Sequence, residues 1–321
     1  MILRCLSVHP QRLAFRQPWH TATGTVSHAE TILLRAESTD KVAWVETCPL
    51  FAANSAAEAL TTFANRLVGR ELSSPEAQAI LAESANDRFV HAGLELLPWV
   101  LDPIPVRTRI GSDTAIPCAR AISMHGGIDA VLARVAQAVA DNVPRVKLKI
   151  APGHDLDLLR PVRTAYPDLR LLVDANAAYS LDSFPRAIDE LALDAIEQPV
   201  ASIADSVSLQ GELSTPICLD ESVRTPADAE FAIASKACRA ITIKIGRVGG
   251  LGPALAIADS AHRAGFPCWV GSMLESPVGT DLNLALASHP HLGPIHGVTD
   301  PSALYTAEAL EALAHFLTKS T

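Results

Sequence analysis

Ionisable side chains end five successive apolar segments in the middle of the chain. They are Lys149, with Lys147 two residues before it, and then Asp174, Glu197, Asp220 and Lys244. Neighbouring members of this series lie 23 to 25 residues apart, about what one strand and one helix of a parallel α/β unit occupy. Carboxylates and amines at one end of such strands could bind a divalent cation and move a proton. The spacing therefore predicts a site for acid–base chemistry beside a metal ion.

The three acids of this series are most simply explained together. A single acid at a strand end is more often a helix cap or a loop residue than a metal ligand, but Asp174, Glu197 and Asp220 follow three adjacent strands. Converging carboxylates repel one another, and a divalent cation removes that repulsion. An all-oxygen ligand set suits Mg²⁺ better than Zn²⁺, with Mn²⁺ as the alternative ion. We therefore expect these three side chains to bind Mg²⁺.

The lysines supply the proton chemistry in this interpretation. Lys147 and Lys149 point the same way from one strand, because strand side chains alternate. A neighbouring ammonium and a nearby cation both favour the neutral amine, so Lys149 is a candidate general base. Lys147 either tunes Lys149 or only neutralises the acids. Lys244 lies across the barrel mouth from Lys149, where it could return a proton α to a carboxylate or stabilise the developing charge.

Lysine is scarce in this chain, with six residues against 20 Arg. A high-GC genome would produce that bias. Three of the six lysines nevertheless stand at the two strand ends described above, where arginine could not replace an amine that must lose its proton. The other three have no such assignment and are expected at the surface: Lys41, Lys236 and Lys319.

A parallel sheet is needed to bring these strand ends together. Short apolar strands alternate with amphipathic helices from residue 103 to residue 296, a pattern typical of a parallel sheet covered on both faces. About seven such units favour a closed (β/α) barrel, with an open doubly wound sheet as the alternative. The expected strands are Pro117–Ile122, Arg145–Ile150, Leu169–Asp174, Ala195–Glu197, Pro216–Asp220, Ala240–Ile245 and Pro267–Val270. The expected helices are Ile128–Asp141, Leu156–Ala165, Phe184–Leu191, Ser202–Leu213, Pro226–Ala234 and Gly252–Ala264.

Residues 1–102 are expected to form a smaller α+β domain. Its predicted antiparallel strands are Ser7–Arg16, Thr31–Glu37 and Lys41–Glu46. Its predicted helices are Ala56–Leu67, Pro75–Glu83 and His91–Val100. A proline-rich segment that begins at Asp102 marks the end of this domain. The tail of the chain adds one more amphipathic helix, at Ala307–Phe316.

Composition excludes several classes of protein. Of the 321 residues, 49% are hydrophobic and 19% are charged, as in a globular protein with a sizeable core. The net charge of −9 argues against a nucleic-acid partner. The six cysteines form no Cys-x-x-Cys pair, which argues against the common zinc and redox motifs. No apolar run reaches the roughly 18 residues of a membrane span and the first residues do not form a signal peptide, so we expect a cytoplasmic protein.

The strand-end motifs resemble those of the enolase superfamily in its muconate-lactonising subgroup, and most nearly those of its o-succinylbenzoate synthases and N-succinylamino acid racemases. The motifs are Val146-Lys-Leu-Lys149, Val173-Asp-Ala-Asn176, Ile196-Glu-Gln-Pro199, Leu219-Asp-Glu-Ser222, Ile243-Lys-Ile-Gly-Arg-Val-Gly-Gly250 and Gly271-Ser-Met-Leu-Glu-Ser276. The resemblance implies an α/β protein, a (β/α)₇β modified TIM barrel over residues 103–296. It also implies an α+β capping domain made of residues 1–102 and joined by the tail, residues 297–321.

The resemblance implies a Mg²⁺-dependent lyase. The reaction would be the syn dehydration of 2-succinyl-6-hydroxy-2,4-cyclohexadiene-1-carboxylate by proton abstraction α to its carboxylate, in menaquinone or phylloquinone biosynthesis. Lys149 would be the base, and Lys244 would face the intermediate from the other side. The alternative on this scaffold is a racemase of N-succinylamino acids or a dipeptide epimerase. The epimerase is disfavoured because the expected Asp-x-Asp pair is absent near Gly271–Ser276. A non-catalytic barrel should have lost a ligand or a lysine, and none is lost.

The resemblance also implies residues that support the ligands and the base. Lys147 would tune Lys149, and Asn176 and Glu221 would lie behind the ligands. The segment expected to meet the succinyl or carboxylate end of the substrate is Ser272, Met273 and Leu274. The partner is therefore a small-molecule carboxylate, with a homo-oligomer left open and neither nucleic acid nor membrane expected.

In the cap, Thr21–Thr25 resembles the mobile loop that shuts the site, although an ordinary turn explains it equally well. Pro18, Trp19 and His20 could line the cap side of the pocket, with a buried edge as the default for the tryptophan.

Several other residues invite a functional interpretation that the sequence does not favour. His289, His291 and His296 are expected in a solvated loop, because neither a carboxylate nor a cysteine stands near them at metal-binding spacing. The segment Gly246–Gly250 is expected to be a tight turn between a strand and a helix, because it lacks the Lys-Ser/Thr of a phosphate-binding loop. Asp300 could be structural or could line the site.

Overall fold

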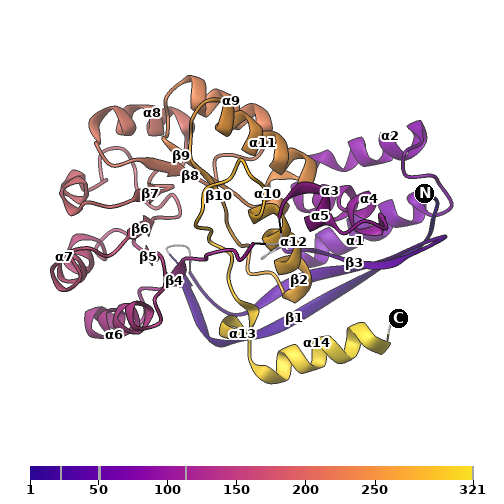
Figure 1. Cartoon of the computed structure of the whole chain (residues 1–321), viewed down its shortest axis with the longest axis horizontal. Helices are drawn as coiled ribbons and strands as arrows, with labels where there is room; N and C mark the ends of the chain where they lie inside the picture. Colours follow the sequence, from indigo (N-terminus) through magenta and orange to yellow (C-terminus); the bar gives the residue numbers. More distant parts are fainter. Residues whose placement is uncertain (22–23, 50–51, 113, 320–321) are drawn as a thin grey trace.

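Two sheets organise the chain, of which the computed structural model describes residues 1–21, 24–49, 52–112 and 114–319 (Figure 1). The first sheet is antiparallel and contains, in this order, β1 (Leu3–Thr21), β2 (Gly24–Ser38) and β3 (Val42–Thr47). The second is parallel, with the strand order β10-β9-β8-β7-β6-β5-β4. Its strands are β4 (Arg120–Ile122), β5 (Val146–Lys149), β6 (Leu171–Asp174), β7 (Ala195–Glu197), β8 (Ile217–Leu219), β9 (Ala240–Ile243) and β10 (Cys268–Val270).

The antiparallel sheet has longer strands than the sequence predicts. β1 and β2 continue past the predicted apolar segments until Thr21 pairs with Gly24, with a register shift between Ala14 and Trp19. The extensions lack the alternation of apolar residues that marks a half-buried strand. They extend toward the parallel sheet in Figure 1 instead of covering the helices of the cap.

Helices of the cap pack on the antiparallel sheet. They are α1 (Ala53–Leu67), α3 (Arg88–Glu95) and α4 (Leu97–Leu101), with α2 (Pro75–Glu83) and a 3-10 turn at Ser84–Asn86 packed against α1 and α3. The short α5 (Val106–Ile110) follows the cap and contacts α12 (Pro277–Ala287) of the barrel. The start of α2 is fixed by Ser74, whose hydroxyl accepts a hydrogen bond from Ala77 N, and by a proline at the first helical position. The single helix predicted at His91–Val100 is wrong, because the helix is interrupted at Leu96 and α4 begins at Leu97 with Pro98 in its first turn.

Helices also cover the outside of the parallel sheet. They are α6 (Gly127–Ala140), α7 (Leu156–Ala165), a 3-10 helix at Arg186–Leu191, α8 (Ile203–Glu212), α9 (Pro226–Ala234), α10 (Ile245–Val248), α11 (Leu251–Arg263) and α12 (Pro277–Ala287). The α-helix predicted at Phe184–Leu191 is wrong, because the segment after Pro185 forms the tighter 3-10 helix. The sequence analysis missed α12, although Ser276 marks its start: the hydroxyl accepts a hydrogen bond from Val278 N.

A short segment after α12 closes the parallel sheet into a barrel. His296 bridges Cys118 just before β4, and Gly297 bridges Gly271 just after β10. Backbone hydrogen bonds of 3.0 and 2.7 Å accompany the two bridges. Residues 296 and 297 therefore occupy the eighth position of the barrel wall, between β10 and β4.

His296 lies within this wall, and the prediction that it belongs to a solvated loop is wrong. The residue is 2% exposed, and its Nδ1 accepts a hydrogen bond of 3.1 Å from Val270 N. Burial, together with the positive charge of Arg145, lowers the pKa of His296 to about 4. The ring is therefore neutral at pH 7.

The depressed pKa of His296 predicts a loss of stability in acid. The unfolded chain binds a proton at this ring below about pH 6.5, whereas the folded chain does so only near pH 4, so the stabilisation is complete above pH 6.5 and decreases as the pH falls. The full effect is about 3 kcal/mol. Between pH 7 and pH 4.5, the free energy of unfolding measured by urea denaturation should fall less in a His296→Asn variant than in the parent protein. The difference between the two losses should be most of this amount. Parallel pH profiles for the two proteins would contradict the assignment.

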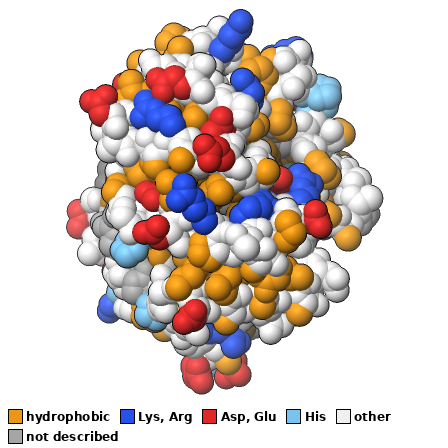
Figure 2. All heavy atoms as spheres, turned by 90° about the vertical axis from the view of Figure 1, so that its left-hand side faces the viewer, with side chains coloured by type: hydrophobic (Ala, Val, Ile, Leu, Met, Phe, Trp, Pro, Cys, Tyr) orange, Lys and Arg blue, Asp and Glu red, His pale blue; other side chains and the backbone are white. Residues whose placement is uncertain are grey.

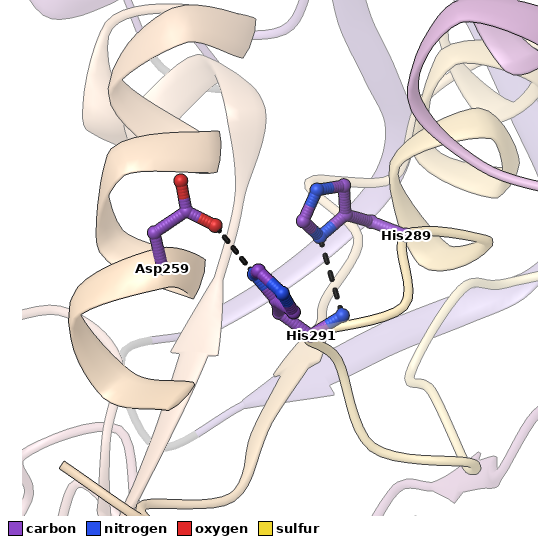
Figure 3. A group of neighbouring side chains, drawn as sticks. All are labelled: Asp259, His289 and His291. Carbon is purple, nitrogen blue, oxygen red and sulfur yellow. Dashed lines mark hydrogen bonds and ion pairs between the residues drawn. The ribbon is translucent and has the colours of Figure 1, made fainter. Parts of the chain in front are cut away.

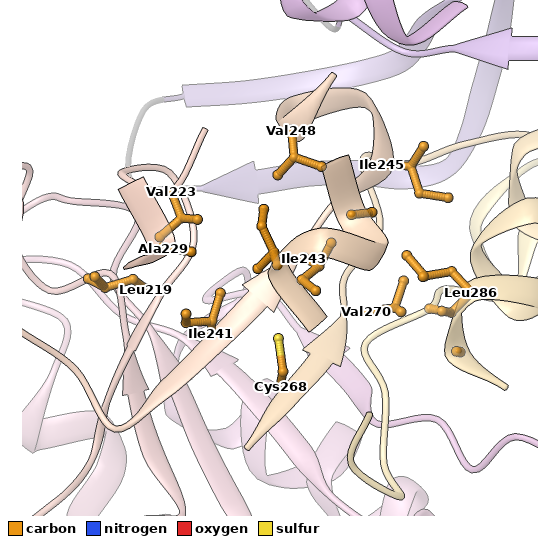
Figure 4. Close-up of a cluster of buried hydrophobic side chains, with 14 of the residues drawn as sticks. Leu219, Val223, Ala229, Ile241, Ile243, Ile245, Val248, Cys268, Val270 and Leu286 are labelled. Atoms are coloured by element: carbon orange, nitrogen blue, oxygen red, sulfur yellow. The ribbon is translucent and has the colours of Figure 1, made fainter. Parts of the chain in front are cut away.

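Side chains along each barrel strand point alternately outward and inward, which separates an apolar outer layer from the interior of the barrel. Ile241 and Ile243 of β9 point outward and pack with Val248, Val270 and Leu286 between the strands and the helices (Figure 4). Each fully buried aliphatic side chain of this kind contributes about 1.5–3 kcal/mol. The alternate positions form a separate cluster inside the barrel: Leu172, Ala195, Cys218, Ala240 and Trp269. Residues two positions further along β6, β7 and β8 face the same way and reach the mouth of the barrel.

The cap contacts the barrel at the start of α11. Glu95 accepts hydrogen bonds from Leu251 N at 2.7 Å and Gly252 N at 2.9 Å, two amides that a helix leaves unpaired at its N-terminus. Gly250 adopts φ +129° and ψ −173° beside this carboxylate. A Cβ atom there would lie 2.2 Å from Glu95 Oε2. The Gly-Gly step after α10 therefore combines the expected tight turn with a close approach to the cap.

We expect Gly250→Ala to lower the free energy of unfolding by about 2–4 kcal/mol, because it adds both backbone strain and a clash with Glu95. The matched control is Gly211→Ala in α8, where an added Cβ meets no atom within 4 Å. Alanine there should be neutral or stabilise by about 0.5–1 kcal/mol. Urea denaturation of the two variants measures the difference, and equal stabilities would show that the close approach carries no constraint.

The tail of the chain returns to the cap. α14 (Ala307–Lys319) follows the short α13 (Pro301–Leu304) and packs along β1 (Figure 1). Phe15 of β1 stacks on the buried Tyr305, with ring centroids 5.5 Å apart.

Among the described residues, no helix has both the length and the apolar character to cross a bilayer. Acidic and basic side chains are interspersed on the face drawn in Figure 2, unlike the continuous basic patch of a nucleic-acid surface.

Candidate active site

The strand ends that the sequence singles out lie side by side at the C-terminal edge of the parallel sheet. In the register of the sheet, Lys149 is opposite Asp174, and Asp174 is opposite Glu197. Asp220 follows β8 and Lys244 follows β9 directly. The three acids are fully buried. The structure therefore brings the predicted ligands and lysines together at one level of the barrel.

Lys147 and Lys149 share one oxygen of Asp174, with Nζ–Oδ2 distances of 2.9 and 2.7 Å. Burial alone would raise the pKa of Asp174, but the two ammonium groups outweigh it and hold the pKa well below its ordinary value. Burial likewise opposes the charge of Lys147, but the acids around it outweigh burial and raise its pKa. Lys147 thus neutralises the acids and, in the same contact, places a lasting positive charge next to Lys149.

Glu197 has a free oxygen in this cluster. Its Oε1 accepts a hydrogen bond of 2.8 Å from Lys147, whereas its buried Oε2 has no hydrogen-bond partner in the described part of the chain. Burial raises the pKa of Glu197 to about 7, although the charge of Lys147 acts against it. An unpaired buried carboxylate oxygen is costly. This oxygen, with Asp174 and Asp220 on either side, fits a divalent cation held by the three acids.

Asp220 is held by two cations. Lys244 Nζ lies 2.8 Å from its Oδ2, and Arg247 contacts the other oxygen. Burial would raise the pKa of Asp220, but Arg247 and then Lys244 outweigh it and lower the pKa to about 2. The sequence analysis assigned Arg247 only to a tight turn and missed this contact. The spacing of Arg247 in the sequence could have indicated this contact. Arg247 follows Lys244 by three residues, and residues three apart lie on one side of a helical turn.

Asn176 and Glu221 extend the network behind Lys149. Asn176 Oδ1 accepts a hydrogen bond of 2.8 Å from Lys149 Nζ, and its amide donates to Glu221 Oε1 at 2.9 Å. Gln198 is a residue that the sequence analysis missed. Its Oε1 accepts hydrogen bonds from the backbone amides of Asp220, at 2.8 Å, and Ser222, at 3.1 Å. It therefore fixes the chain where Asp220 leaves its strand.

The segment from Ser272 to Leu274 forms one wall of the site. Glu275 accepts hydrogen bonds from Ser272 Oγ at 2.5 Å and from Met273 N at 2.8 Å. Cys48 of the cap contacts Met273 O at 3.1 Å, and the Tyr305 hydroxyl donates to Leu274 O. Residues from the cap and the tail therefore hold this barrel loop in place.

Glu46 of the cap holds the next few residues, at the start of α12. Its carboxylate accepts hydrogen bonds from Ser276 N, Ser276 Oγ and Gly279 N, and from Thr31 within the cap. Burial raises the pKa of Glu46 despite these bonds. Cap and barrel are thus joined directly beside the wall of the site.

A cavity of about 430 Å³ lies between the cap and the barrel mouth. Its floor carries Lys147, Lys149, Lys244, Arg247 and Glu221, and Met273 and Leu274 line one side. The cap supplies Phe15, Trp19, Val26, His28 and Glu30. Only Trp19 of these was considered from the sequence. Val26, His28 and Glu30 occupy alternate positions of β2 and therefore face the same side of the strand.

The remaining candidates from the sequence fall outside the site or outside the described residues. Asp300 caps α13, where it accepts hydrogen bonds from Ser302 N and Oγ at 2.8 Å. The loop Thr21–Thr25 includes residues 22 and 23, which lie outside the described residues. His289 and His291 stand partly exposed in the loop after α12, where His291 Nδ1 lies 2.6 Å from Asp259 Oδ1 and His289 Nδ1 accepts a hydrogen bond of 3.4 Å from His291 N.

Comparison with known proteins agrees with this geometry. Residues 130–313 match the family described as "Enolase C-terminal domain-like". The chain is 35% identical over 296 residues to an o-succinylbenzoate synthase of Geobacillus kaustophilus, covering 86% of this chain and 79% of that protein. It is 37% identical over 264 residues to an N-succinylamino acid racemase of Thermus thermophilus, covering 78% and 72%. An enolase superfamily member from Listeria innocua has a TM-score of 0.85 at 27% identity, covering 95% and 88%.

Fold and site together define an α/β-barrel protein with a capping domain and a cluster of buried acids and lysines at the barrel mouth. The chain belongs to the enolase superfamily.

Proposed function

We propose that this protein is a Mg²⁺-dependent o-succinylbenzoate synthase, which dehydrates 2-succinyl-6-hydroxy-2,4-cyclohexadiene-1-carboxylate in menaquinone or phylloquinone biosynthesis. The observation that carries the proposal is the placement of two lysines, Lys149 from β5 and Lys244 after β9, around one cavity with three buried acids between them. The synthases among the relatives cover most of the chain. Apolar side chains on the cap side of the cavity suit the ring of this substrate.

Asp174, Glu197 and Asp220 would hold the metal ion. Their donors are all carboxylate oxygens, and the unpaired Glu197 Oε2 is available for a ligand bond. When bound, the ion supplies positive charge next to the substrate carboxylate, where negative charge develops as the α-proton leaves. The lysines that lie among the acids in this structure would then be free to act on the substrate.

The chain's own groups would carry out the proton transfers. Lys149 takes the α-proton as the neutral amine, the C–H electron pair moves into the ring system, and the resulting ammonium protonates the departing hydroxyl to release water. Asn176 orients Lys149 through the contact at 2.8 Å. Lys244 holds a positive charge on the opposite side of the substrate. Cap residues over the cavity exclude water from these steps.

A racemase of N-succinylamino acids is the second candidate, because the same two lysines face one cavity and a racemase has comparable identity to this chain. In that reaction Lys149 and Lys244 would exchange a proton with the α-carbon from opposite faces. Both reactions begin with removal of a proton α to a carboxylate. The first step therefore does not distinguish the two reactions, whereas the choice of substrate does.

A direct assay tests the proposal. Purified protein with Mg²⁺ is given the cyclohexadiene carboxylate and, in parallel, an N-succinylamino acid. Formation of o-succinylbenzoate with the larger kcat/KM supports the synthase. Efficient racemisation without dehydration would replace it by the racemase. Inactivity toward both substrates, with Mg²⁺ bound, would reject both.

A further inference from the structure

A group of histidines lies far from the candidate active site. His289 and His291 are in the loop after α12, and Asp259 and His262 are on α11. The same loop is hydrogen-bonded to the first residue of β10, from Gly293 N to Cys268 O at 2.8 Å. The start of a barrel strand and the active-site edge are at opposite ends of the barrel. The histidine group therefore occupies the end that the proposed reaction does not use.

The side chains of this group converge. His291 Nδ1 lies 2.6 Å from Asp259 Oδ1, and Figure 3 shows both histidine rings turned toward the aspartate from one loop. Ligand atoms of Asp259, His289 and His291 all lie within 4.8 Å of one another. Two atoms bound to one tetrahedral ion are about 3.4 Å apart for bonds of about 2.1 Å. Small rotations of the side chains therefore suffice to place all three on one ion.

Neighbouring contacts prepare the rings for a metal. The ring of His262 stacks on His291, with centroids 4.0 Å apart and planes within 6°, which limits rotation of His291. His289 Nδ1 accepts a hydrogen bond of 3.4 Å from His291 N, which holds the ring of His289 beside His291. The Asp259 and His291 side chains are 42% and 39% exposed. An ion could thus enter and keep water in the remaining positions.

We propose that Asp259, His289 and His291 form a second metal site, selective for a late first-row divalent cation such as Zn²⁺. Two imidazoles and one carboxylate are a typical zinc donor set and a poor one for Mg²⁺, which prefers oxygen. The bound ion connects α11 to the loop that leads to His296 and Gly297, the residues that close the barrel. Its role is therefore stabilisation of that closure rather than catalysis.

The test is calorimetric titration of Zn²⁺ into the full chain in excess Mg²⁺, which occupies the oxygen ligands of the active site. We expect one Zn²⁺ per chain, and a His289→Gln/His291→Gln variant that binds it at least about 100-fold more weakly. A single Asp259→Asn variant should weaken binding as well. The control is His315→Gln, which removes an exposed imidazole from α14 and should leave binding unchanged.

Two further measurements accompany the titration. Co²⁺ in place of Zn²⁺ should give the visible absorption of a low-coordinate nitrogen–oxygen site in the parent protein and not in the double variant. Zn²⁺ should also raise the melting temperature of the parent more than that of the variant. Circular dichroism establishes that the variants fold. Equal Zn²⁺ affinity in the parent and the double variant, or the lack of Zn²⁺ binding by the parent, overturns the proposal whatever the catalytic assays give.

Discussion

A Lys149→Ala variant is expected to lose turnover by about 10⁴-fold or more, on either proposed substrate. Lys149 is the amine that both contacts Asp174 and Asn176 and lines the cavity. Removing a general base typically costs about 10²–10⁴-fold. The loss should reach the upper end here, because the same group also protonates the leaving hydroxyl in the dehydration. Steady-state kcat/KM with Mg²⁺ measures the effect.

Controls for Lys149→Ala must separate chemistry from folding and metal binding. Lys147 remains on Asp174 in the variant, with its Nζ–Oδ2 contact of 2.9 Å, so the acid keeps a counter-charge. We therefore expect unchanged circular dichroism and retained Mg²⁺ binding by calorimetry. Lys319→Ala near the C-terminus is the matched control, because it removes an exposed lysine. Turnover close to the parent rate in Lys149→Ala would show that another group is the base.

The strand ends were the most predictable part of this protein. Lys149, Asp174, Glu197, Asp220 and Lys244 follow apolar strands at near-constant intervals, and a parallel sheet places equal positions of neighbouring strands at one height. The regular spacing of these residues in the sequence and their common height in the barrel therefore have the same cause, the repeat of one strand and one helix. The same logic predicted the seven barrel strands, because continuous apolar segments of strand length are the signature of a sheet buried on both faces.

The contacts made across long separations in the chain were not predictable from the sequence. Glu95 reaches the start of α11, and Asp259 reaches His291, over 156 and 32 residues respectively. No local periodicity records which helix N-terminus an acid will meet. The closure of the barrel at residues 296 and 297 was missed for a related reason. This segment forms only one bridge on each side, so it is too short to show a pattern of alternation.

Apart from Trp19, the cap side of the cavity was also not predicted, for a different physical reason. His28 and Glu30 lie on the part of β2 that precedes the predicted strand Thr31–Glu37, and this part faces a cavity rather than a core. A strand with polar side chains on its inner face has the composition of a loop, so pattern analysis ended the predicted strands too early. Substrate specificity in this chain is expected to depend on such positions.

Replacing Lys244 with arginine is expected to separate the two proposed reactions. Arginine keeps a positive charge near Asp220, which pairs with Lys244 Nζ at 2.8 Å and also with Arg247, but it cannot release a proton at neutral pH. Dehydration needs only that charge, so it should persist at a reduced rate, within about 100-fold of the parent. Racemisation needs an amine on this side to exchange a proton with the α-carbon. It should therefore fall by about 10³-fold or more.

The two outcomes are read on the same preparation, by the absorbance of o-succinylbenzoate and by the optical rotation of the N-succinylamino acid. Lys244→Ala supplies the comparison, because it removes both the charge and the proton and should abolish both activities. Equal losses in Lys244→Arg and Lys244→Ala would mean that dehydration also requires proton transfer at Lys244. Retained racemisation in Lys244→Arg would mean that the second proton comes from another group. Either result would change the role assigned to Lys244. Retained dehydration with lost racemisation, the expected result, would mean that Lys244 contributes its charge rather than a proton to the synthase reaction.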